Sequence, residues 1–516
     1  MFNASSIYKN VSVSTYLVHV RTKTKIHWAK LKKKTGPKYK ALNNFDEFYG
    51  SVFGEQWQTI REAMFRSSKY VAIVNNYGDA EETIETLTNR GAHCLKKLMS
   101  TQKEFNRQYN PQTESNKLEN EKQLELKTSR LDEYLQRQTS EEISSLYPSA
   151  DNAPDRLDFE KDEPTSGHQK KVYEDVNIPN KTLDESIAEA EIDTTRIIDP
   201  SMGITSEALY QFLPATKLKG MDEWLPESTH YSFYSKDKDF PLVIEPEAEL
   251  NYPEHLKVYT YEMGSEMKTF PEPKRSQTGV YNYYPMDGGS VLPVLALGLR
   301  SGDRVLDLCS APGGKSLIML QTLLPDVIIC NDISISRSNR TRSTFRNYFF
   351  DFQTSNKWRE RVVFNRIDGR HYEDDQGFDK VLVDVPCTTD RHTVNTDENN
   401  IFRPDRIKER LRLPEMQSQL LVNALKLVKV GGTVVYSTCS LSPVQNDGVV
   451  HMSLKRAFEA HSIVAAIKDL SVPMSALSST LVLGSGSTAP QYGQLVTPSI
   501  SANFGPSYLA KLVRVR

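Results

Sequence analysis

Cysteine is scarce in this chain of 516 residues: there are only five, and no two of them form a Cys-x-x-Cys pair. That number and spacing argue against a disulfide framework and against a structural zinc site, and favour a reducing compartment. Long apolar runs are also lacking. The mean hydropathy is −0.51, and the absence of any run of about 18 apolar residues predicts no membrane span. We therefore expect neither a bound metal nor a membrane partner.

Acidic residues are absent from residues 1–45, which contain ten Lys or Arg. An acid-free start with serines is typical of a mitochondrial transit peptide, so we assign residues 1–25 to such a peptide and expect the protein in the mitochondrial matrix. A basic arm that binds RNA phosphates is the alternative. Residues 26–100 are assigned to a basic and helical extension. A buried helix face is predicted there, with a partner surface as the alternative, from Phe45, Phe48, Phe53, Trp57, Ile60, Met64 and Phe65.

Apolar periodicity is almost missing from residues 111–165. The surrounding segment, 101–255, is rich in Glu, Gln, Asp, Ser, Thr and Asn. Such a composition cannot bury enough apolar surface to offset the entropy of ordering the chain. We therefore expect residues 101–255 to be a largely disordered acidic insertion.

Residues 256–516 have a different pattern, in which strand-like and helix-like runs alternate. Strands are predicted at 304–309, 327–332, 361–367, 380–385 and 433–438, with helices such as 315–324 and 415–427 between them. Strand–helix alternation is typical of βαβ units and a mostly parallel sheet. Residues 507–515 predict an antiparallel strand that closes the sheet. The expected fold is a Rossmann-like α/β sheet with helices on both faces.

A glycine-rich turn follows the first of these strands, in the sequence VLDLCSAPGGKS at residues 305–316. Gly313 and Gly314 allow a ligand to approach the backbone closely, and the helix start supplies free N–H groups. The spacing matches neither the GxGxxG pattern nor the P-loop, so a dinucleotide or a triphosphate is poorly supported. A tight turn without a ligand is the alternative.

Acidic residues follow the next two strands. Asp332 can hydrogen-bond a ribose diol, and Arg337 is close enough in sequence to face the same ligand. Asp368, followed by Gly369, can accept a hydrogen bond from an adenine amino group. A helix cap and a turn are the respective alternatives.

Two cysteines follow the last two parallel strands. Asp384 and Cys387 lie in VLVDVPCTTDRH (381–392), and Cys439 lies in VVYSTCSLSPVQN (434–446). Ligands of open α/β sheets bind beyond the carboxyl ends of the strands. A lone cysteine is usually a small core residue, but two at this edge, one of them near an aspartate, favour catalysis.

These motifs together resemble the Sun family of RNA cytosine-5 methyltransferases, in particular its mitochondrial branch that acts on small-subunit rRNA. They are DLCSAPGGK, DVPCTTDRH, YSTCS and the LPxxQ of residues 413–417, and the resemblance extends to NFGP at 503–506. It implies a class I methyltransferase fold with S-adenosylmethionine as methyl donor. The donor would be held by Gly313, Gly314, Lys315, Asp332, Arg337, Asp368, Gly369 and Asp384. Asp384 would also contact N3 of the target base.

The resemblance further implies that Cys439 is the nucleophile and that Cys387 releases the product. The residues alone leave the reverse assignment open. RNA contact is expected along a basic stretch, with a solvated helix face as the alternative: Arg391, His392, Arg403, Arg406, Lys408, Arg410 and Arg412. A helical-repeat protein of the mitochondrial termination-factor family is implied as partner. The alternative functions are a mainly non-catalytic factor for mitochondrial ribosome assembly, and a tRNA cytosine-5 methyltransferase.

Overall fold

The computed structural model describes residues 36–109, 240–265, 269–485 and 489–516. The expected transit peptide (1–25), the start of the basic extension and most of the expected acidic insertion lie outside these residues. Within them, no helix is both long and apolar enough to span a membrane.

A nine-stranded sheet forms the centre of the molecule, in the order β3-β11-β13-β10-β9-β6-β7-β8, with β12 paired to β13. Five neighbouring strands run parallel: β10 (Val428–Thr438), β9 (Phe378–Asp384), β6 (Arg304–Asp307), β7 (Val327–Asn331) and β8 (Val362–Asn365). The remaining strands are β3 (Val243–Pro246), β11 (Ala465–Asp469), β12 (Gln494–Val496) and β13 (Ser507–Arg514). The five parallel strands coincide with the five runs predicted from the sequence.

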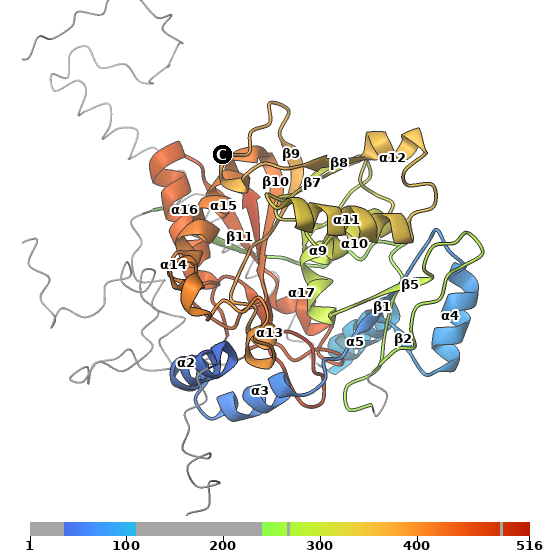
Figure 1. Cartoon of the computed structure of the whole chain (residues 1–516), viewed down its shortest axis with the longest axis horizontal. Coiled ribbons are helices and arrows are strands. Elements are labelled where there is room, and N and C mark those ends of the chain that lie inside the picture. Colours follow the sequence, from blue (N-terminus) through green and yellow to red (C-terminus); the bar gives the residue numbers. More distant parts are fainter. Residues whose placement is uncertain (1–35, 110–239, 266–268, 486–488) are drawn as a thin grey trace, which may run out of the picture.

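Helices cover both faces of this sheet, as Figure 1 shows. The N-terminal α2 (Pro37–Phe53) and α3 (Gln56–Phe65) pack against α13 (Asp390–Asn395) at the end of the sheet. One face of the sheet carries α15 (Leu413–Leu427) and α16 (Asp447–His461). The other carries α9 (Leu292–Leu297), α10 (Gly314–Gln321), α11 (Ile335–Tyr348), α12 (Asn356–Arg361) and α17 (Ser471–Ser475). Short helices follow the strand ends: η6 (Gly369–His371), α13 (Asp390–Asn395), η7 (Pro404–Arg406) and α14 (Ile407–Leu411). The Rossmann-like fold expected from the sequence is confirmed.

A smaller antiparallel sheet has the order β2-β4-β1-β5. Its strands are β1 (Val71–Val74), β2 (His93–Cys94), β4 (Val258–Thr260) and β5 (Tyr283–Met286). Helix α4 (Ala80–Asn89) lies between β1 and β2 in the chain, and α5 (Leu95–Tyr109) follows β2. Val71 and Ile73 belong to the core shared with the large sheet, whereas Ala72 and Val74 pack toward Leu87 of α4. Both faces of β1 are therefore buried.

Three local differences from the sequence expectations have physical causes. The extension contains strands as well as helices, because the apolar run Val71–Val74 pairs with β4 and β5. The other residues of the predicted helix face are buried, but Phe65 is 44% exposed at the last residue of α3. The segment Val243–Pro246, placed in the insertion by its surroundings, pairs in parallel with β11.

The C-terminal strand has the predicted antiparallel orientation but a different position in the sheet. Ser507–Arg514 is antiparallel to β10, as predicted, but it also pairs with β11 and therefore lies inside the sheet. Strand β3 forms the edge instead. Pairing on both sides explains why six of the eight residues of this strand are buried.

Candidate active site

The carboxyl ends of the five parallel strands meet at one edge of the large sheet, and the predicted site residues lie at or just beyond these ends. β9 and β10 are neighbours in register, with Asp384 opposite Ser437. The loops that follow them therefore leave the sheet side by side. That register brings Cys387 and Cys439 together, although 52 positions separate them in the chain.

The two cysteine sulfurs are in contact, with the Sγ atoms 3.0 Å apart. Cys439 is exposed and Cys387 is partly buried. The backbone N–H of Cys439 also donates to Cys387 Sγ, at 3.4 Å. Cys439 is therefore the more exposed of the two residues, and its sulfur packs against that of Cys387.

The two thiols have opposite pKa shifts. The contact with Cys439 lowers the pKa of Cys387 below its ordinary value. The same contact, followed by burial and by the negative charge of Asp384, raises the pKa of Cys439. Cys387 therefore loses its proton more readily than Cys439. A thiolate next to a thiol can take up that thiol's proton when the thiol reacts.

Asp384 at the end of β9 connects the cysteines to the glycine-rich turn. Its carboxylate lies 2.7 Å from Nζ of Lys315 and accepts a hydrogen bond of 2.8 Å from Oγ of Ser437. Burial alone would lower the pKa of Lys315, but the charge of Asp384 and the hydrogen bond to it raise the pKa above its ordinary value. The pair is therefore an ion pair beside the two thiols.

Neighbouring side chains pack closely against the two glycines of the glycine-rich turn, Gly313 and Gly314. Gly313 has a φ of +98°, and a Cβ added there would lie 2.7 Å from Thr341 Cγ2. A Cβ on Gly314 would lie 3.0 Å from the hydroxyl of Tyr284. Gly314 begins α10, so the first N–H groups of this helix lack partners within the helix. The turn accepts no larger residue and presents free donors to a ligand.

Asp332 and Arg337 face each other after β7. The carboxylate of Asp332 is 3% exposed and lies 3.3 Å from the guanidinium of Arg337. Arg337 also donates to the carbonyl of Ala311 in the glycine-rich turn, at 3.0 Å. The structure therefore brings the acid after the second strand next to the turn after the first strand.

Asp368 and Gly369 lie after β8, where Asp368 accepts several hydrogen bonds from Arg370. These hydrogen bonds lower the pKa of Asp368. A Cβ on Gly369 would lie 2.8 Å from Cδ2 of Leu420. Packing against α15 therefore requires glycine at position 369. The carboxylate of Asp368 already has a cationic partner in Arg370.

Sequence reasoning assigned no role to four residues that the structure places around the site. Gln417, noted only within the LPxxQ motif, donates to the carbonyl of Pro386 at 2.8 Å and to Gln445 at 3.2 Å. Asp307 at the end of β6 is buried, its Oδ1 has no hydrogen-bond partner among the described residues, and burial raises its pKa to about 7. Tyr49 and Asp390 lie behind the cysteines. Asp307, Asp390 and Gln417 lie within motifs that the sequence had singled out, whereas Tyr49 carried no such signal.

The residues of the predicted RNA-contacting stretch fall into two groups in the structure, one that links chain segments and one that is exposed. Arg391 donates to the carbonyl of Gly505 at 2.7 Å and to Asn503 at 2.8 Å, so its guanidinium holds two chain segments together. Arg403, Lys408 and Arg412 are exposed on or beside η7 and α14. The surface cations of this stretch therefore begin after α13.

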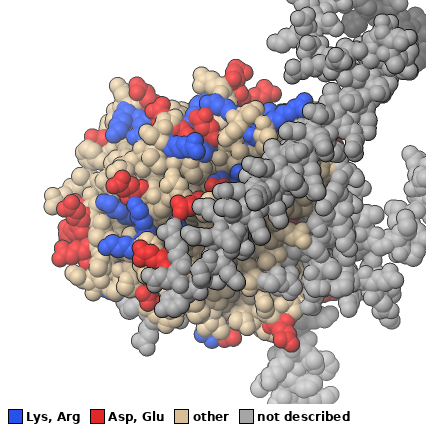
Figure 2. All heavy atoms as spheres, turned by 180° about the vertical axis from the view of Figure 1, so that it is seen from behind, with Lys and Arg blue, Asp and Glu red and all other residues tan. Residues whose placement is uncertain are grey.

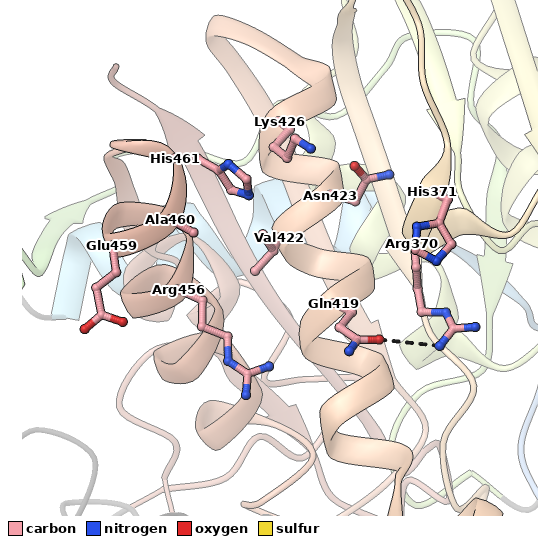
Figure 3. A pocket seen from close by; sticks show the side chains of 10 residues that line it. All are labelled: Arg370, His371, Gln419, Val422, Asn423, Lys426, Arg456, Glu459, Ala460 and His461. Atoms are coloured by element: carbon pink, nitrogen blue, oxygen red, sulfur yellow. Dashed lines mark hydrogen bonds between the residues drawn. The ribbon is translucent and has the colours of Figure 1, made fainter. Parts of the chain in front are cut away.

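A separate pocket lies between η6, α15 and α16 (Figure 3). Its two arginines are paired with acids: Arg370 with Asp368 and Arg456 with Glu415. On the uncovered part of the face shown in Figure 2, cations and anions are interspersed in the same way. Neither region presents a continuous basic surface.

Similarity to known proteins extends along the chain. Residues 294–479 match the family model described as 16S rRNA methyltransferase RsmB/F. The 5-cytosine rRNA methyltransferase nsun-4 of Caenorhabditis elegans is 32% identical over 526 residues, covering 99% of this chain and 100% of that protein. The 5-cytosine rRNA methyltransferase NSUN4 of Mus musculus is 42% identical over 275 residues, covering 53% of this chain and 70% of that protein.

A mitochondrial tRNA (cytosine(34)-C(5))-methyltransferase of Mus musculus is 34% identical over 265 residues, covering 51% of this chain and 71% of that protein. All three relatives are cytosine-5 methyltransferases, and the nematode protein is matched over its whole length. The fold and this family imply S-adenosylmethionine as the methyl donor. The chain belongs to the Sun family of RNA cytosine-5 methyltransferases.

Proposed function

We propose that this enzyme methylates C5 of a cytosine in mitochondrial small-subunit rRNA, through a covalent adduct between Cys439 and C6 of the base. The observation that carries the proposal is the contact between the Sγ atoms of Cys387 and Cys439, 3.0 Å apart beside Asp384. This chemistry needs a thiol that adds to the base and a second group that removes the proton from C5.

The choice of rRNA rests on the degree of similarity. Over a similar length, the mouse rRNA enzyme is 42% identical to this chain and the mouse tRNA enzyme 34%. The relative that is matched over its whole length is also described as an rRNA methyltransferase. A tRNA substrate is the less favoured alternative.

The mitochondrial matrix is the proposed location, and residues 1–25 are the proposed transit peptide, because this start combines Lys and Arg with an absence of acids. The proposed segments are residues 26–100 as the N-terminal extension, 101–255 as the acidic insertion and 256–516 as the methyltransferase domain. The strand Val243–Pro246, within the second of these segments, forms the edge of the large sheet. A helical-repeat protein of the mitochondrial termination-factor family is the proposed partner, and a contribution to mitochondrial ribosome assembly is the proposed consequence.

The residues at the sheet edge fit S-adenosylmethionine. Asp332 is a buried acid at the end of the second strand, where a ribose diol can donate to it. The turn at Gly313 and Gly314 has no room for a side chain and leaves helix N–H groups free. Lys315 and Arg337 complete the set, with Asp368 and Gly369 beside the proposed adenine position. When bound, this donor supplies an electrophilic methyl group.

The proposed role of Cys439 is to add its sulfur to C6, which makes C5 electron-rich enough to take the methyl group. As the S–C6 bond forms, the thiol proton passes to Cys387, whose sulfur lies 3.0 Å away. After that proton reaches solvent, the Cys387 thiolate takes the proton from C5, the ring double bond reforms and the S–C6 bond breaks. Cys439 leaves as a thiolate and takes up the proton that Cys387 has removed from C5, so both thiols end as they began.

Asp384 and Lys315 are proposed to stabilise the charge that develops on the base. N3 of cytosine only accepts hydrogen bonds, so a bare carboxylate cannot contact it favourably. Lys315 holds a proton 2.7 Å from the carboxylate of Asp384. A proton shared between these groups can shift toward N3 as the adduct forms.

The test is a denaturing gel of purified variants incubated with S-adenosylmethionine and mitochondrial small-subunit rRNA, with and without the partner protein. Cys387→Ala should accumulate a slowly migrating protein–RNA species, and Cys439→Ala should not form it. Cys94→Ala is the matched control, because Cys94 lies in the small sheet and should leave turnover unchanged.

Two results would contradict the proposal. An adduct that accumulates with Cys439→Ala and disappears with Cys387→Ala would reverse the two roles. If the unaltered enzyme and its partner form no 5-methylcytosine in the rRNA but methylate mitochondrial tRNA, the tRNA substrate is favoured. If neither RNA is methylated, the assembly role is favoured.

A further inference from the structure

Asp390, at the start of α13, is a fully buried acid that binds groups from both cysteine loops. Its carboxyl oxygens accept hydrogen bonds from the hydroxyl of Thr388, from Oγ of Ser440 at 3.1 Å and from the N–H of Leu441 at 2.7 Å. Thr388 directly follows Cys387 in the chain, and Ser440 directly follows Cys439.

The backbone of Asp390 adds a further link. Its N–H donates to the carbonyl of Cys439 at 3.3 Å. A single residue therefore joins the loop after β9 to the loop after β10 immediately behind the two sulfurs. Asp390 is therefore placed to set the position of one cysteine loop relative to the other.

The remaining donor to this carboxylate comes from the N-terminal helix α2. The hydroxyl of Tyr49 donates to Oδ2 of Asp390 at 2.6 Å, across 341 positions of sequence. The ring of Tyr49 is buried and packs at 4.9 Å from Phe45 and 5.3 Å from Trp57, between ring centroids. Packing holds the hydroxyl in place, so the tyrosine is a fixed donor.

We propose that Tyr49 is a positioning residue for the methyl transfer and acts through Asp390 to hold Cys387 and Cys439 in contact. The proposal rests on the proposed adduct chemistry of these two cysteines. It makes α2, which lies outside the residues that match the family model, part of the catalytic scaffold. A shift of about 1 Å in a reacting group lowers the rate by up to about 100-fold, so such a scaffold has a measurable effect.

The test compares Tyr49→Phe with the unaltered enzyme, because phenylalanine keeps the ring packing and removes only the hydroxyl. We expect kcat for rRNA methylation to fall about 10-fold, while KM for the RNA changes less than about twofold. Ser51→Ala is the matched control: this hydroxyl of the same helix bonds only locally, to the carbonyl of Phe48 at 2.7 Å. Its kcat should be unchanged.

A second measurement distinguishes positioning from general stabilisation. The contact with Cys439 is the largest influence that lowers the pKa of Cys387. If Tyr49→Phe loosens that contact, the pH midpoint for alkylation of Cys387 by iodoacetamide should rise, whereas mere loss of stability would leave the midpoint of the folded enzyme unchanged. Mass spectrometry assigns the modified thiol. Unchanged kcat and an unchanged midpoint would overturn the proposal.

A double-mutant cycle with Asp390→Asn gives a further criterion. If Tyr49 acts through Asp390, the double variant should lose no more kcat than Asp390→Asn alone. Losses that multiply would show that Tyr49 acts independently and would overturn the proposal. If Tyr49→Phe does not fold, Ser440→Ala takes its place in the cycle, because it removes another hydroxyl donor to Asp390. An inactive unaltered enzyme would contradict the proposed function instead, so the two failures are distinguishable.

Discussion

The ammonium of Lys315, in the glycine-rich turn, lies 2.7 Å from the carboxylate of Asp384, which is 69 positions later in the chain. This ion pair joins the proposed donor site to the proposed base site, because Lys315 lies in the first turn of α10 and Asp384 ends β9. The two side chains are largely shielded from solvent, at 13% and 29% exposure. A change at either residue should therefore affect both sites.

Asp384→Asn should lower kcat for rRNA methylation by about 100-fold, because the uncharged amide no longer holds the proton of Lys315 near the base. Lys315→Met should have a comparable effect and should also weaken donor binding. Steady-state methylation with tritiated S-adenosylmethionine measures the rates. Asp379→Asn breaks a lysine–aspartate pair of similar length, 2.8 Å to Lys429, outside the site. An equal loss of kcat in this control would contradict the prediction.

Cys387→Ala should lower the pH midpoint for alkylation of Cys439. The contact with Cys387 is the largest influence that raises the pKa of Cys439, so its removal leaves burial and Asp384 as the remaining influences. A lower pKa makes thiolate available at lower pH, and alkylation by iodoacetamide follows the thiolate. Cys94→Ala should leave the midpoint of Cys439 unchanged. A midpoint that rises in Cys387→Ala would show that Cys387 favours the Cys439 thiolate.

Asp307→Asn should stabilise the free enzyme, and more so at higher pH. Burial raises the pKa of Asp307 from 3.8 to about 7. Ionisation of this carboxyl therefore reduces the stability of the folded state as pH rises from the unfolded to the folded pKa. At pH values above about 7 the gain reaches an upper limit of about 4 kcal/mol.

Urea unfolding between about pH 5 and about pH 8 measures this gain. Asp405→Asn is the control, because Asp405 is exposed in η7 and its replacement removes no buried carboxyl. A stability gain for Asp307→Asn that is constant with pH would contradict the prediction.

Gly313→Ala should weaken donor binding and reduce stability by about 1–3 kcal/mol, because it combines a positive φ with a contact of the new Cβ at 2.7 Å from Thr341. Calorimetry with S-adenosylhomocysteine and thermal unfolding measure the two effects. Gly50→Ala should instead stabilise α2 by about 0.5–1 kcal/mol, because its Cβ would meet nothing closer than 3.9 Å. Equal effects of the two substitutions would contradict the steric argument.

The sequence alone predicted the parallel strands and the loops that hold the site, because these depend on local apolar runs and on short motifs. It also predicted that Asp332, Asp384, Cys387 and Cys439 lie near one sheet edge, since parallel strands end on the same side. Composition separated residues 101–255 from the α/β region, although the strand at Val243–Pro246 lies within that segment. Such a short strand is recognised only by its pairing with β11.

Only the tertiary structure decided how these residues are paired. The register of β9 against β10 brings two thiols to 3.0 Å and gives them opposite pKa shifts. Lys315 pairs with Asp384, Arg370 with Asp368, and Tyr49 reaches Asp390 across 341 positions. Residue types and spacing cannot specify such contacts, because they depend on the distances between side chains from different elements, and burial then determines how strongly each charge interacts with its neighbours.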